Sequence, residues 1–437
     1  MTVERVQVLT SLIECAADGV DVAEQLKTDV LISGGGFAGL TLAVALVRCL
    51  GPGLAVTVVD RGSEAKPSEA ADDPRAVAIS ASSRRLLAAI GLWGELEDHA
   101  EPVRRIEITD SGLQAGLRPV LLAWDNDIEE AGENATAAHI VPLPIIQRAL
   151  ERAVSGHDEI VFLRPAEIVA LETDGFAARA TTRDGRQIAA RLAVAADGQR
   201  SVLREAAGIK SVGWPYDQIG IATTVEHTIE HGGVAVQHFL PAGPFAILPL
   251  RGKRCCVTWT ERTAEGRRIL ALDDERFLAE LDLRFGGKLG TLSLGGGRRA
   301  WPLSLHLARG YVGNRVALIG DAAHGVHPIA GQGLNLAFRD VAALVEVIAD
   351  TARTGLDFGD AGSLERYERW RRFDSLQAAA AFDAINALFS RDGQLLRSVR
   401  EFGLQVVDRL PALKRALVGE AAGLTGELPK LLRGELV

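Results

Sequence analysis

Hydrophobic residues near the start of the chain fall into three blocks. Asp29 to Ser33 holds a short apolar run, Leu40 to Leu50 is longer and largely apolar, and Leu54 to Asp60 is rich in β-branched residues. Blocks of these lengths predict a strand, a helix and a second strand, which make one βαβ unit. The uncharged stretch Val30 to Val47 is nearly long enough to span a bilayer, but its three consecutive glycines favour a turn between strand and buried helix.

The turn between the first strand and the helix has the spacing Gly34-x-Gly36-x-x-Gly39, and Asp60 follows at the end of the second strand. In this context the spacing predicts a dinucleotide site, because the glycines allow a tight turn, a close approach to a pyrophosphate and close packing of helix on strand. The helix N-terminus attracts phosphates, and Asp60 is placed to accept hydrogen bonds from a ribose. The alternative is a glycine turn with a purely structural role.

Helical and extended patterns alternate through the middle of the chain. A loop containing Arg75, which is either a ligand-binding or a solvated arginine, precedes a helix that ends at Gly91, and a second helix follows Pro144. The polar segment from Asp125 to Ala137 is predicted to be a loop. Predicted hairpin turns lie at Asp174-Gly175, at Asp184-Gly185 and around residues 241–244, the last within a β-rich region from Ile219 to Thr260.

A second glycine-rich turn appears far downstream. An apolar strand ends at Gly320-Asp321, and after a proline-containing loop a helix begins near Gly331 to Gly333. Its apolar positions recur at helical spacing: Leu334, Ala337, Val341, Leu344, Val345 and Ile348. A second helix N-terminus aimed at a bound group favours a cofactor longer than a nicotinamide dinucleotide, such as FAD, stretched between the two turns.

Composition narrows the class of protein. With 437 residues, 47% of them hydrophobic, and 46 glycines, the chain fits a large α/β enzyme with two or three units. The formal charge of −9 disfavours broad contact with nucleic acid or with an anionic membrane surface, although it allows local basic patches. Four cysteines without metal-ligand spacing and a start that resembles no secretory signal or transit peptide favour a reduced, cytoplasmic setting and no metal site.

The C-terminal part is predicted to be mostly helical after Asp340. The basic residues Arg366, Arg369, Arg371 and Arg372 are predicted to form a solvated face. An apolar stretch either packs on the main body or forms a partner-binding or membrane-surface helix, and it contains Phe402, Leu404, Val406, Val407, Leu410, Leu413 and Leu417.

Three segments, "GGGFAG", "AADGQRSVLREAAGI" and "GDAAHGVHPIAGQGLNLAFRD", together resemble the signatures of group A flavoprotein aromatic hydroxylases, which have the p-hydroxybenzoate hydroxylase fold. Within that family, "DPRAVAIS", "GWPYDQIGIATTVEH", "FLPAGPFAILPL" and the C-terminal "LFSRDGQLLRSVREFGLQVVDRLPALKRAL" are similar to ubiquinone-biosynthesis hydroxylases of the UbiH type. The similarity runs from about Thr28 to about Gly423.

The resemblance implies roles for individual residues. The implied FAD-binding residues are Gly34, Gly36, Phe37, Ala38, Gly39, Asp60, Arg61, Arg75, Gln147, Asp197, Gly198, Gly320, Asp321, Pro328, Gly331, Gly333, Leu334 and Asn335. The implied catalytic residues are Arg75, Pro328, Gly331 and Gln332, and those implied to face substrate are Tyr216, His238, Leu248 and Pro249. The chain departs from the family pattern at Pro142-Leu143-Pro144, where Glu-Asn-Arg is frequent, and at His238, where arginine or glutamate is usual.

The resemblance also implies an α/β architecture with a Rossmann-like FAD-binding domain, an interleaved β-sheet substrate domain and a C-terminal helical segment. The expected FAD-binding domain is discontinuous, with residues 28–100, 141–204 and 300–355, and the expected substrate domain comprises residues 101–140 and 205–299. Residues 1–27 form an N-terminal extension and residues 356–437 the helical segment.

The implied activity is hydroxylation of an aromatic ring by a flavin C4a-hydroperoxide, with NAD(P)H or another electron donor and O2, most simply on a polyprenylated phenol in ubiquinone biosynthesis. A base would help to remove the phenol proton, and Tyr216, His231, His238, His324 and His327 are candidates. Alternatives are a hydroxylase of soluble phenols, an alkene reductase and a non-catalytic flavin-binding assembly protein; a halogenase is disfavoured because Trp-x-Trp-x-Ile-Pro is absent. Such a substrate implies contact with a membrane surface or with biosynthetic partner proteins, as a monomer or a homodimer.

Overall fold

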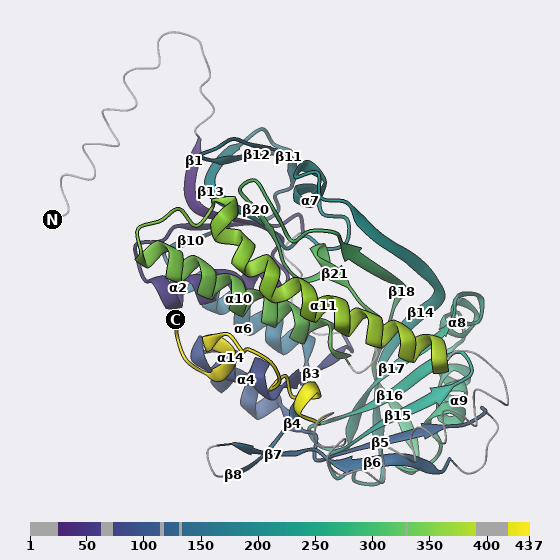
Figure 1. Cartoon of the computed structure of the whole chain (residues 1–437). Coiled ribbons are helices and arrows are strands. Elements are labelled where there is room, and N and C mark those ends of the chain that lie inside the picture. Colours follow the sequence, from purple (N-terminus) through teal and green to yellow (C-terminus); the bar gives the residue numbers. More distant parts are fainter. Residues whose placement is uncertain (1–24, 63–72, 114–117, 131–132, 328–330, 390–417) are drawn as a thin grey trace.

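The computed structural model describes residues 25–62, 73–113, 118–130, 133–327, 331–389 and 418–437, and two large sheets form its main layers (Figure 1). The predicted Pro328 and the apolar stretch from Phe402 to Leu417 therefore lie outside the described residues. No helix among the described residues is both long and apolar enough to cross a bilayer.

The first sheet contains the predicted βαβ unit. Its strand order is β10-β2-β1-β13-β12-β11, with β20 added beside β13 and β19 paired to β20. The strands are β1 (Leu26–Ser33), β2 (Val56–Val59), β10 (Ile160–Leu163), β11 (Ile168–Thr173), β12 (Ala178–Thr182), β13 (Gln187–Ala195), β19 (Val312–Gly313) and β20 (Val316–Leu318). The pairs β10–β2, β2–β1, β1–β13 and β13–β20 are parallel, so their carboxyl ends meet at one edge. Both glycine-rich turns leave the sheet at that edge, where ligands bind in such folds.

Three helices pack together with this sheet: α2 (Phe37–Leu50), α6 (Leu143–Ser155) and α10 (Gly333–Arg353) (Figure 1). Helix α2 is buried from Gly39 to Val47, which explains why its sequence is apolar on all sides. The stretch Val30 to Val47 is thus a strand, a turn and a buried helix, as predicted.

The second sheet has the order β21-β18-β14-β17-β16-β15-β5-β6. Its strands are β5 (Arg105–Asp110), β6 (Val120–Asp125), β14 (Ser211–His227), β15 (Val234–Leu240), β16 (Gly243–Leu250), β17 (Arg254–Arg262), β18 (Leu292–Ala308) and β21 (His324–Gly325). Helices α8 (Thr263–Leu270) and α9 (Asp274–Phe285) cover one face, where Phe277 and Phe285 pack on Phe245 and Trp259. The expected domain boundary at residue 300 falls inside β18.

The opposite face of this sheet turns toward a small sheet made of β3 (Ala76–Ser80), β9 (Ala138–Pro142) and β4 (Glu101–Pro102). Leu248, Leu250 and Cys256 pack there with Ala76 and Ala78. The loop predicted from Asp125 to Ala137 was wrong in part, because β7 (Asp127–Glu130) and β8 (Glu133–Thr136) form a hairpin. Hairpin pairing uses backbone groups, so a polar segment can form it, and Ile128 packs against the buried residues Ala81 and Ala137.

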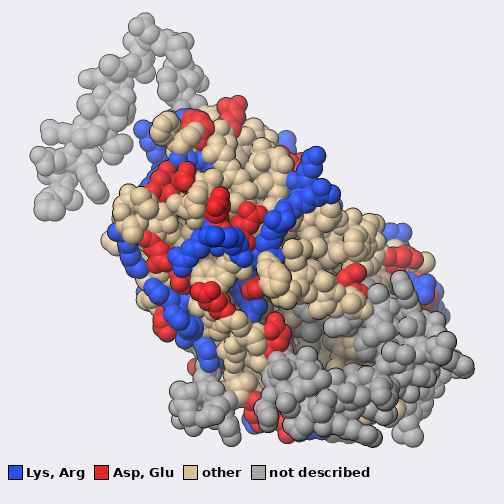
Figure 2. Space-filling model, in the orientation of Figure 1, with Lys and Arg blue, Asp and Glu red and all other residues tan. Residues whose placement is uncertain are grey.

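Shorter helices complete the described chain: α4 (Ala81–Ala89), α5 (Trp93–Leu96), α7 (Val202–Ala206) and α14 (Lys430–Arg433). The long helix α11 (Ala361–Phe389) crosses the front of the molecule in Figure 1. Figure 2 shows the same face, on which Lys and Arg side chains are interspersed with Asp and Glu over the described surface. The prediction of a solvated basic face on α11 was wrong for Arg371, whose side chain is 3% exposed and bound to Asp340.

Candidate functional site

The three glycines of the first turn have separate physical roles, as their spacing predicts. Gly34 has φ +110°, and a side chain there would collide with the carbonyl oxygen of Ala196. A side chain at Gly39 would collide with the carbonyl oxygen of Gly34, because α2 starts so close to β1. A Cβ at Gly36 meets no atom within 4 Å. Gly34 and Gly39 are therefore required by the fold, whereas Gly36 keeps open the space in front of the helix N-terminus.

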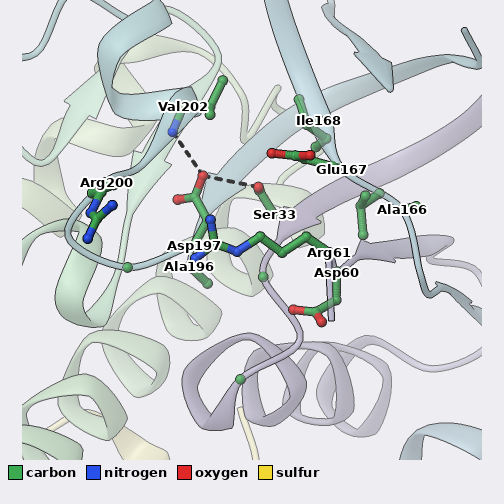
Figure 3. A pocket seen from close by; sticks show the side chains of 14 residues that line it. Ser33, Asp60, Arg61, Ala166, Glu167, Ile168, Ala196, Asp197, Arg200 and Val202 are labelled. Atoms are coloured by element: carbon green, nitrogen blue, oxygen red, sulfur yellow. Dashed lines mark hydrogen bonds between the residues drawn. The ribbon is translucent and has the colours of Figure 1, made fainter. Parts of the chain in front are cut away.

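A cavity of about 290 Å³ opens beside this turn (Figure 3). Asp60 lines it at the end of β2, and its carboxylate accepts the N–H groups of Gly35 (2.7 Å) and Gly62 (2.8 Å). Each carboxylate oxygen has a further lone pair that can accept a hydroxyl donor. The predicted residues Arg61, Asp197 and Gly198 also line the cavity, and so does Arg200. Its size and mixed polar lining suit an adenosine group.

Asp197 fixes the wall of the cavity opposite Asp60. Its Oδ2 atom accepts hydrogen bonds from the Ser33 hydroxyl (3.2 Å) and from the N–H of Val202 (3.1 Å), as the dashed lines in Figure 3 show. Burial raises the pKa of this carboxyl above its usual value, although its hydrogen bonds act in the other direction. Asp197 thus ties the end of β1 to the start of α7.

The second glycine-rich turn lies directly against the first. Gly320 has φ +58°, and a Cβ there would be 3.4 Å from the Cβ atoms of both Ala38 in α2 and Ala337 in α10. The two turns, almost three hundred residues apart in sequence, therefore share one edge of the sheet. One extended ligand could therefore touch both turns at this edge.

Asp321 is the acidic residue of this second turn that is available to a ligand. Its side chain is exposed, and it accepts no hydrogen bond from the described residues. The protein nevertheless surrounds it closely enough that loss of hydration raises its pKa. An accessible carboxylate in a recess suits a polyhydroxy group, which can replace the missing water.

The N-terminus of α10 is attached to β3 by Asn335. Its side-chain oxygen accepts the N–H of Ser80 (3.0 Å), and its amide donates to the carbonyl of Ala78 (2.8 Å) and to Gln332 (3.3 Å). Gly331 has φ +63° and lies beside Ala78, and Gly333 and Leu334 open the helix. Asn335 therefore orients the segment that the resemblance places against the flavin.

Arg75 lies just before β3, within reach of the same region. Its guanidinium donates to Asp73 (2.7 Å) and lies 5.9 Å from the centre of the Trp301 ring in the second sheet. The arginine is thus held at the junction of the two sheets. Gln147 gives no support to the predicted flavin contact, because its side-chain amide donates to Glu151 of the same helix (3.0 Å).

A buried ionic cluster behind the second turn was missed by sequence reasoning. Asp340 is 0% exposed. Its carboxylate accepts hydrogen bonds from the N–H of Gly320 (2.9 Å), from Nε2 of His324 (2.6 Å) and from Nε of Arg371 (2.8 Å). Burial alone would raise the pKa of Asp340, but His324 and Arg371 hold it below its usual value. A signal existed, since Asp340 falls on the apolar face of its helix between Ala337 and Leu344.

The residues expected to face substrate are not all brought together. Tyr216 donates to Asp383 of α11 (2.6 Å), and its ring contacts the edge of His327 with centroids 5.4 Å apart. Leu248 lies on the face of the second sheet that turns toward β3. His238 stacks on Phe245, on the face covered by α8 and α9. Pro249, next to Leu248 in β16, alternates onto that same covered face.

His238 is buried, and its burial should make the stability of the protein depend on pH. Burial, with a smaller effect of Arg118, lowers the pKa of His238 to about 4 from 6.5. The unfolded chain therefore binds a proton that the folded chain excludes, so stability falls as the pH drops from about 6.5 to about 4, by roughly 3 kcal/mol in total. His238→Phe should flatten this dependence in urea unfolding at pH 4.5 to 7.5; an unchanged slope would contradict the assignment.

Gly36 permits a direct test of the first turn. Gly36→Ala should leave the apoprotein as stable as the parent, because its Cβ has free space, yet reduce FAD affinity at least tenfold by filling the path of the pyrophosphate. The control is Gly39→Ala, which should destabilise the apoprotein itself. Urea unfolding and titration with FAD separate the two effects. Equal stability losses in both variants would show that Gly36 is structural.

The described residues fit FAD. The cavity lies at the Asp60 end, Gly36 and the N-terminus of α2 come next, Asp321 follows, and α10 begins beyond it. An adenosine, a pyrophosphate, a sugar chain and a flavin ring follow each other in the same order along the cofactor. Two helix N-termini supply the N–H groups and partial positive charge that its anionic parts need.

Comparison with known proteins agrees with this geometry. A family model described as "FAD binding domain" matches residues 27–380. The chain is 41% identical over 409 residues to the ubiquinone hydroxylase UbiL of Rhodospirillum rubrum, covering 93% of this chain and 92% of that one. It is 31% identical over 404 residues to the 3-demethoxyubiquinol 3-hydroxylase of Escherichia coli, covering 91% and 99%.

The solved structure of p-nitrophenol 4-monooxygenase PnpA from Pseudomonas putida has the same fold, with a TM-score of 0.75 at 18% identity over 92% of this chain and all of that one. The expected α/β architecture of the p-hydroxybenzoate hydroxylase fold is therefore confirmed. Taken with the two glycine turns that meet at one sheet edge, these similarities show that the chain belongs to the FAD-dependent monooxygenases of the FAD-binding-domain family, within the group that contains the ubiquinone hydroxylases.

Proposed function

We propose that this enzyme hydroxylates the aromatic ring of a polyprenylated phenol in ubiquinone biosynthesis, using O2 and electrons from NAD(P)H or another donor. The observation that carries the proposal is the contact of the two glycine turns at Gly320, Ala38 and Ala337, which supports one continuous FAD site beside an apolar sheet face. The relatives named for ubiquinone hydroxylation support the substrate class.

Bound FAD supplies the reducible ring on which oxygen is activated. The chain holds the cofactor through the helix N-termini of α2 and α10 and through Asp60 and Asp321. Asn335 keeps the start of α10 against β3, so the donors at Gly331 to Gly333 are fixed before any charge develops. Fixed donors stabilise negative charge on a ring at lower reorganisation cost than water does.

The second sheet supplies the apolar side of the site. Leu248, Leu250 and Cys256 face β3, and Thr224 donates to the carbonyl of Pro74, beside Arg75 (3.3 Å). An apolar wall excludes water, and exclusion of water protects a reactive oxygen species from wasteful decay. The same wall suits an aromatic ring with an alkyl chain better than a highly charged substrate.

Tyr216 contacts two other titratable groups, Asp383 of α11 and His327, which follows β21. Burial lowers the pKa of His327 to about 4, so this imidazole is neutral at pH 7. Neither of its ring nitrogens has a hydrogen-bond partner among the described residues. A neutral imidazole can accept the proton of a phenol hydrogen-bonded to it, and we propose His327 for this role, although its low pKa makes it a weaker base than a free imidazole.

The test uses the FAD-loaded protein with NADH, O2 and a polyprenyl phenol, with p-nitrophenol as the soluble comparison. We expect NADH oxidation to be stimulated by the prenylated phenol and the product to gain one oxygen by mass spectrometry. Stimulation by the soluble phenol alone would favour a catabolic hydroxylase, and absence of any hydroxylated product would favour a flavin-binding assembly protein. His327→Gln should lower kcat and shift its pH profile without loss of flavin.

A further inference from the structure

Four large hydrophobic side chains are exposed on α11 and on the first part of β14. Phe373 is 64% exposed, Leu376 43%, Trp214 49% and Val212 42%. Exposed hydrophobic residues are common when scattered, but a group of them marks a contact surface. We name this group, Val212, Trp214, Phe373 and Leu376, the α11–β14 patch.

Three hydrogen bonds place α11 near the first part of β14. Glu368 accepts the N–H of Tyr311 (3.0 Å), two residues after Arg309, whose N–H donates to the carbonyl of Lys210 (2.8 Å). At the other end Tyr216 donates to Asp383 (2.6 Å). The helix extends about 22 Å from Glu368 to Asp383, and the strand extends about 20 Å from Lys210 to Tyr216.

The four hydrophobic residues therefore lie at matching levels between these anchors. Val212 and Trp214 alternate onto the same side of β14 as Tyr216, the side that meets α11. Phe373 and Leu376 are three residues apart and so share one face of the helix, which Ala380 and Ala384 continue. Between Ser375 and Ala381 the helix has no charged residue.

Basic side chains border the patch. Lys210, Arg309 and Arg369 are exposed, and none forms an ion pair with the described residues. Two of the nearby acids are already paired, since Glu368 lies 4.0 Å from Arg372 and Asp374 lies 2.9 Å from Arg371, whereas Asp217 and Glu365 are exposed and form no ion pair with the described residues. Figure 2 shows Lys and Arg side chains along the border of an uncharged area on this face.

We propose that the α11–β14 patch is the surface by which the enzyme docks on an anionic lipid bilayer. Exposed Phe, Leu and Trp side chains enter the boundary between headgroups and acyl chains, and basic side chains beside them attract anionic headgroups. The surface accounts for access to a membrane-held substrate, and in this respect the inference rests on the proposed function. Because Tyr216 and Asp383 anchor the same helix and strand beside His327, the docked face adjoins the proposed site.

The experiment measures binding of the full-length, FAD-loaded protein to phosphatidylcholine vesicles with and without phosphatidylglycerol, by co-sedimentation. We expect binding that requires phosphatidylglycerol, weakens as salt is raised, and falls at least tenfold in Phe373→Ser/Leu376→Ser. Phe176→Ser is the matched control, because Phe176 is 86% exposed in the turn between β11 and β12, and it should bind as the parent does. Lys210→Gln/Arg369→Gln should reduce binding severalfold, whereas Arg276→Gln on α9 should not.

Absence of vesicle binding by the parent, or equal loss in Phe176→Ser and the double variant, would overturn the proposal. Capture of a protein partner through an intact patch without vesicle binding would do the same. Flavin content and turnover of a short-chain soluble phenol should be unchanged in the double variant, which shows that it is folded. Vesicle binding without any hydroxylated product would leave the docking surface standing and overturn the proposed function instead.

Discussion

Replacing Asp321 with alanine is expected to give a colourless protein, with FAD affinity reduced at least a hundredfold. The carboxylate of Asp321 is exposed at the second glycine turn and accepts no hydrogen bond from the described residues, so its removal leaves no internal partner unpaired. The lost interaction is charge-assisted and lies in a poorly hydrated recess, where hydrogen bonds to charged groups contribute more than in open solvent. The measurement is the absorbance ratio of purified protein near 450 and 280 nm, followed by titration of the apoprotein with FAD.

The stability of the apoprotein separates a binding role from a structural one. Asp321→Ala should unfold in urea as the parent apoprotein does. Asp321→Asn should keep more flavin than Asp321→Ala, because the amide oxygen still accepts a hydrogen bond. Full flavin content in Asp321→Ala would show that the cofactor is held without this residue.

Replacing Asp340 with alanine is expected to lower the free energy of unfolding by about 3–5 kcal/mol, because it leaves the buried Arg371 side chain without its partner. It also removes the acceptor for the N–H of Gly320, so the second turn should loosen and FAD affinity should fall as well. Urea unfolding of the apoprotein measures the first effect, and FAD titration measures the second.

Asp350→Ala is the matched control for that variant. Asp350 pairs with Arg366 at 2.7 Å, but both side chains are exposed, so its loss should cost less than about 1 kcal/mol. If Asp340→Ala does not fold, Asp340→Asn keeps the shape and one acceptor and should show an intermediate loss. A loss no larger than that of Asp350→Ala would contradict the structural role.

The contribution of Asp340 to the free energy of unfolding should depend on pH in a defined direction. The pKa of Asp340 is lower in the folded protein than its usual 3.8, so its contribution is complete at neutral pH and disappears only as the pH falls below about 4. His238 acts in a higher window, from about 6.5 down to about 4. Acid titration of Asp340→Asn and His238→Phe should therefore change different parts of the stability curve.

Local features of the chain were enough to predict the first turn and the second. Gly34, Gly36 and Gly39 follow an apolar run and precede an apolar helix, and backbone geometry allows few arrangements of such a segment. The same reasoning placed Asp321 after a strand and Gly331 to Gly333 at a helix start. The hairpins at Asp174-Gly175 and Asp184-Gly185 could also be predicted from the sequence, because a hairpin turn depends on adjacent residues.

The tertiary structure alone decided which charged residues bind ligand and which hold the fold. Asp321 and Asp340 are both acids near the second turn, and only the packing of α11 and β21 against α10 shows that Asp340 is bonded to Arg371 and His324. The face occupied by His238 was likewise set by α8 and α9. Burial and ion pairing depend on contacts between residues distant in sequence, and a local pattern carries no information about which distant residue arrives.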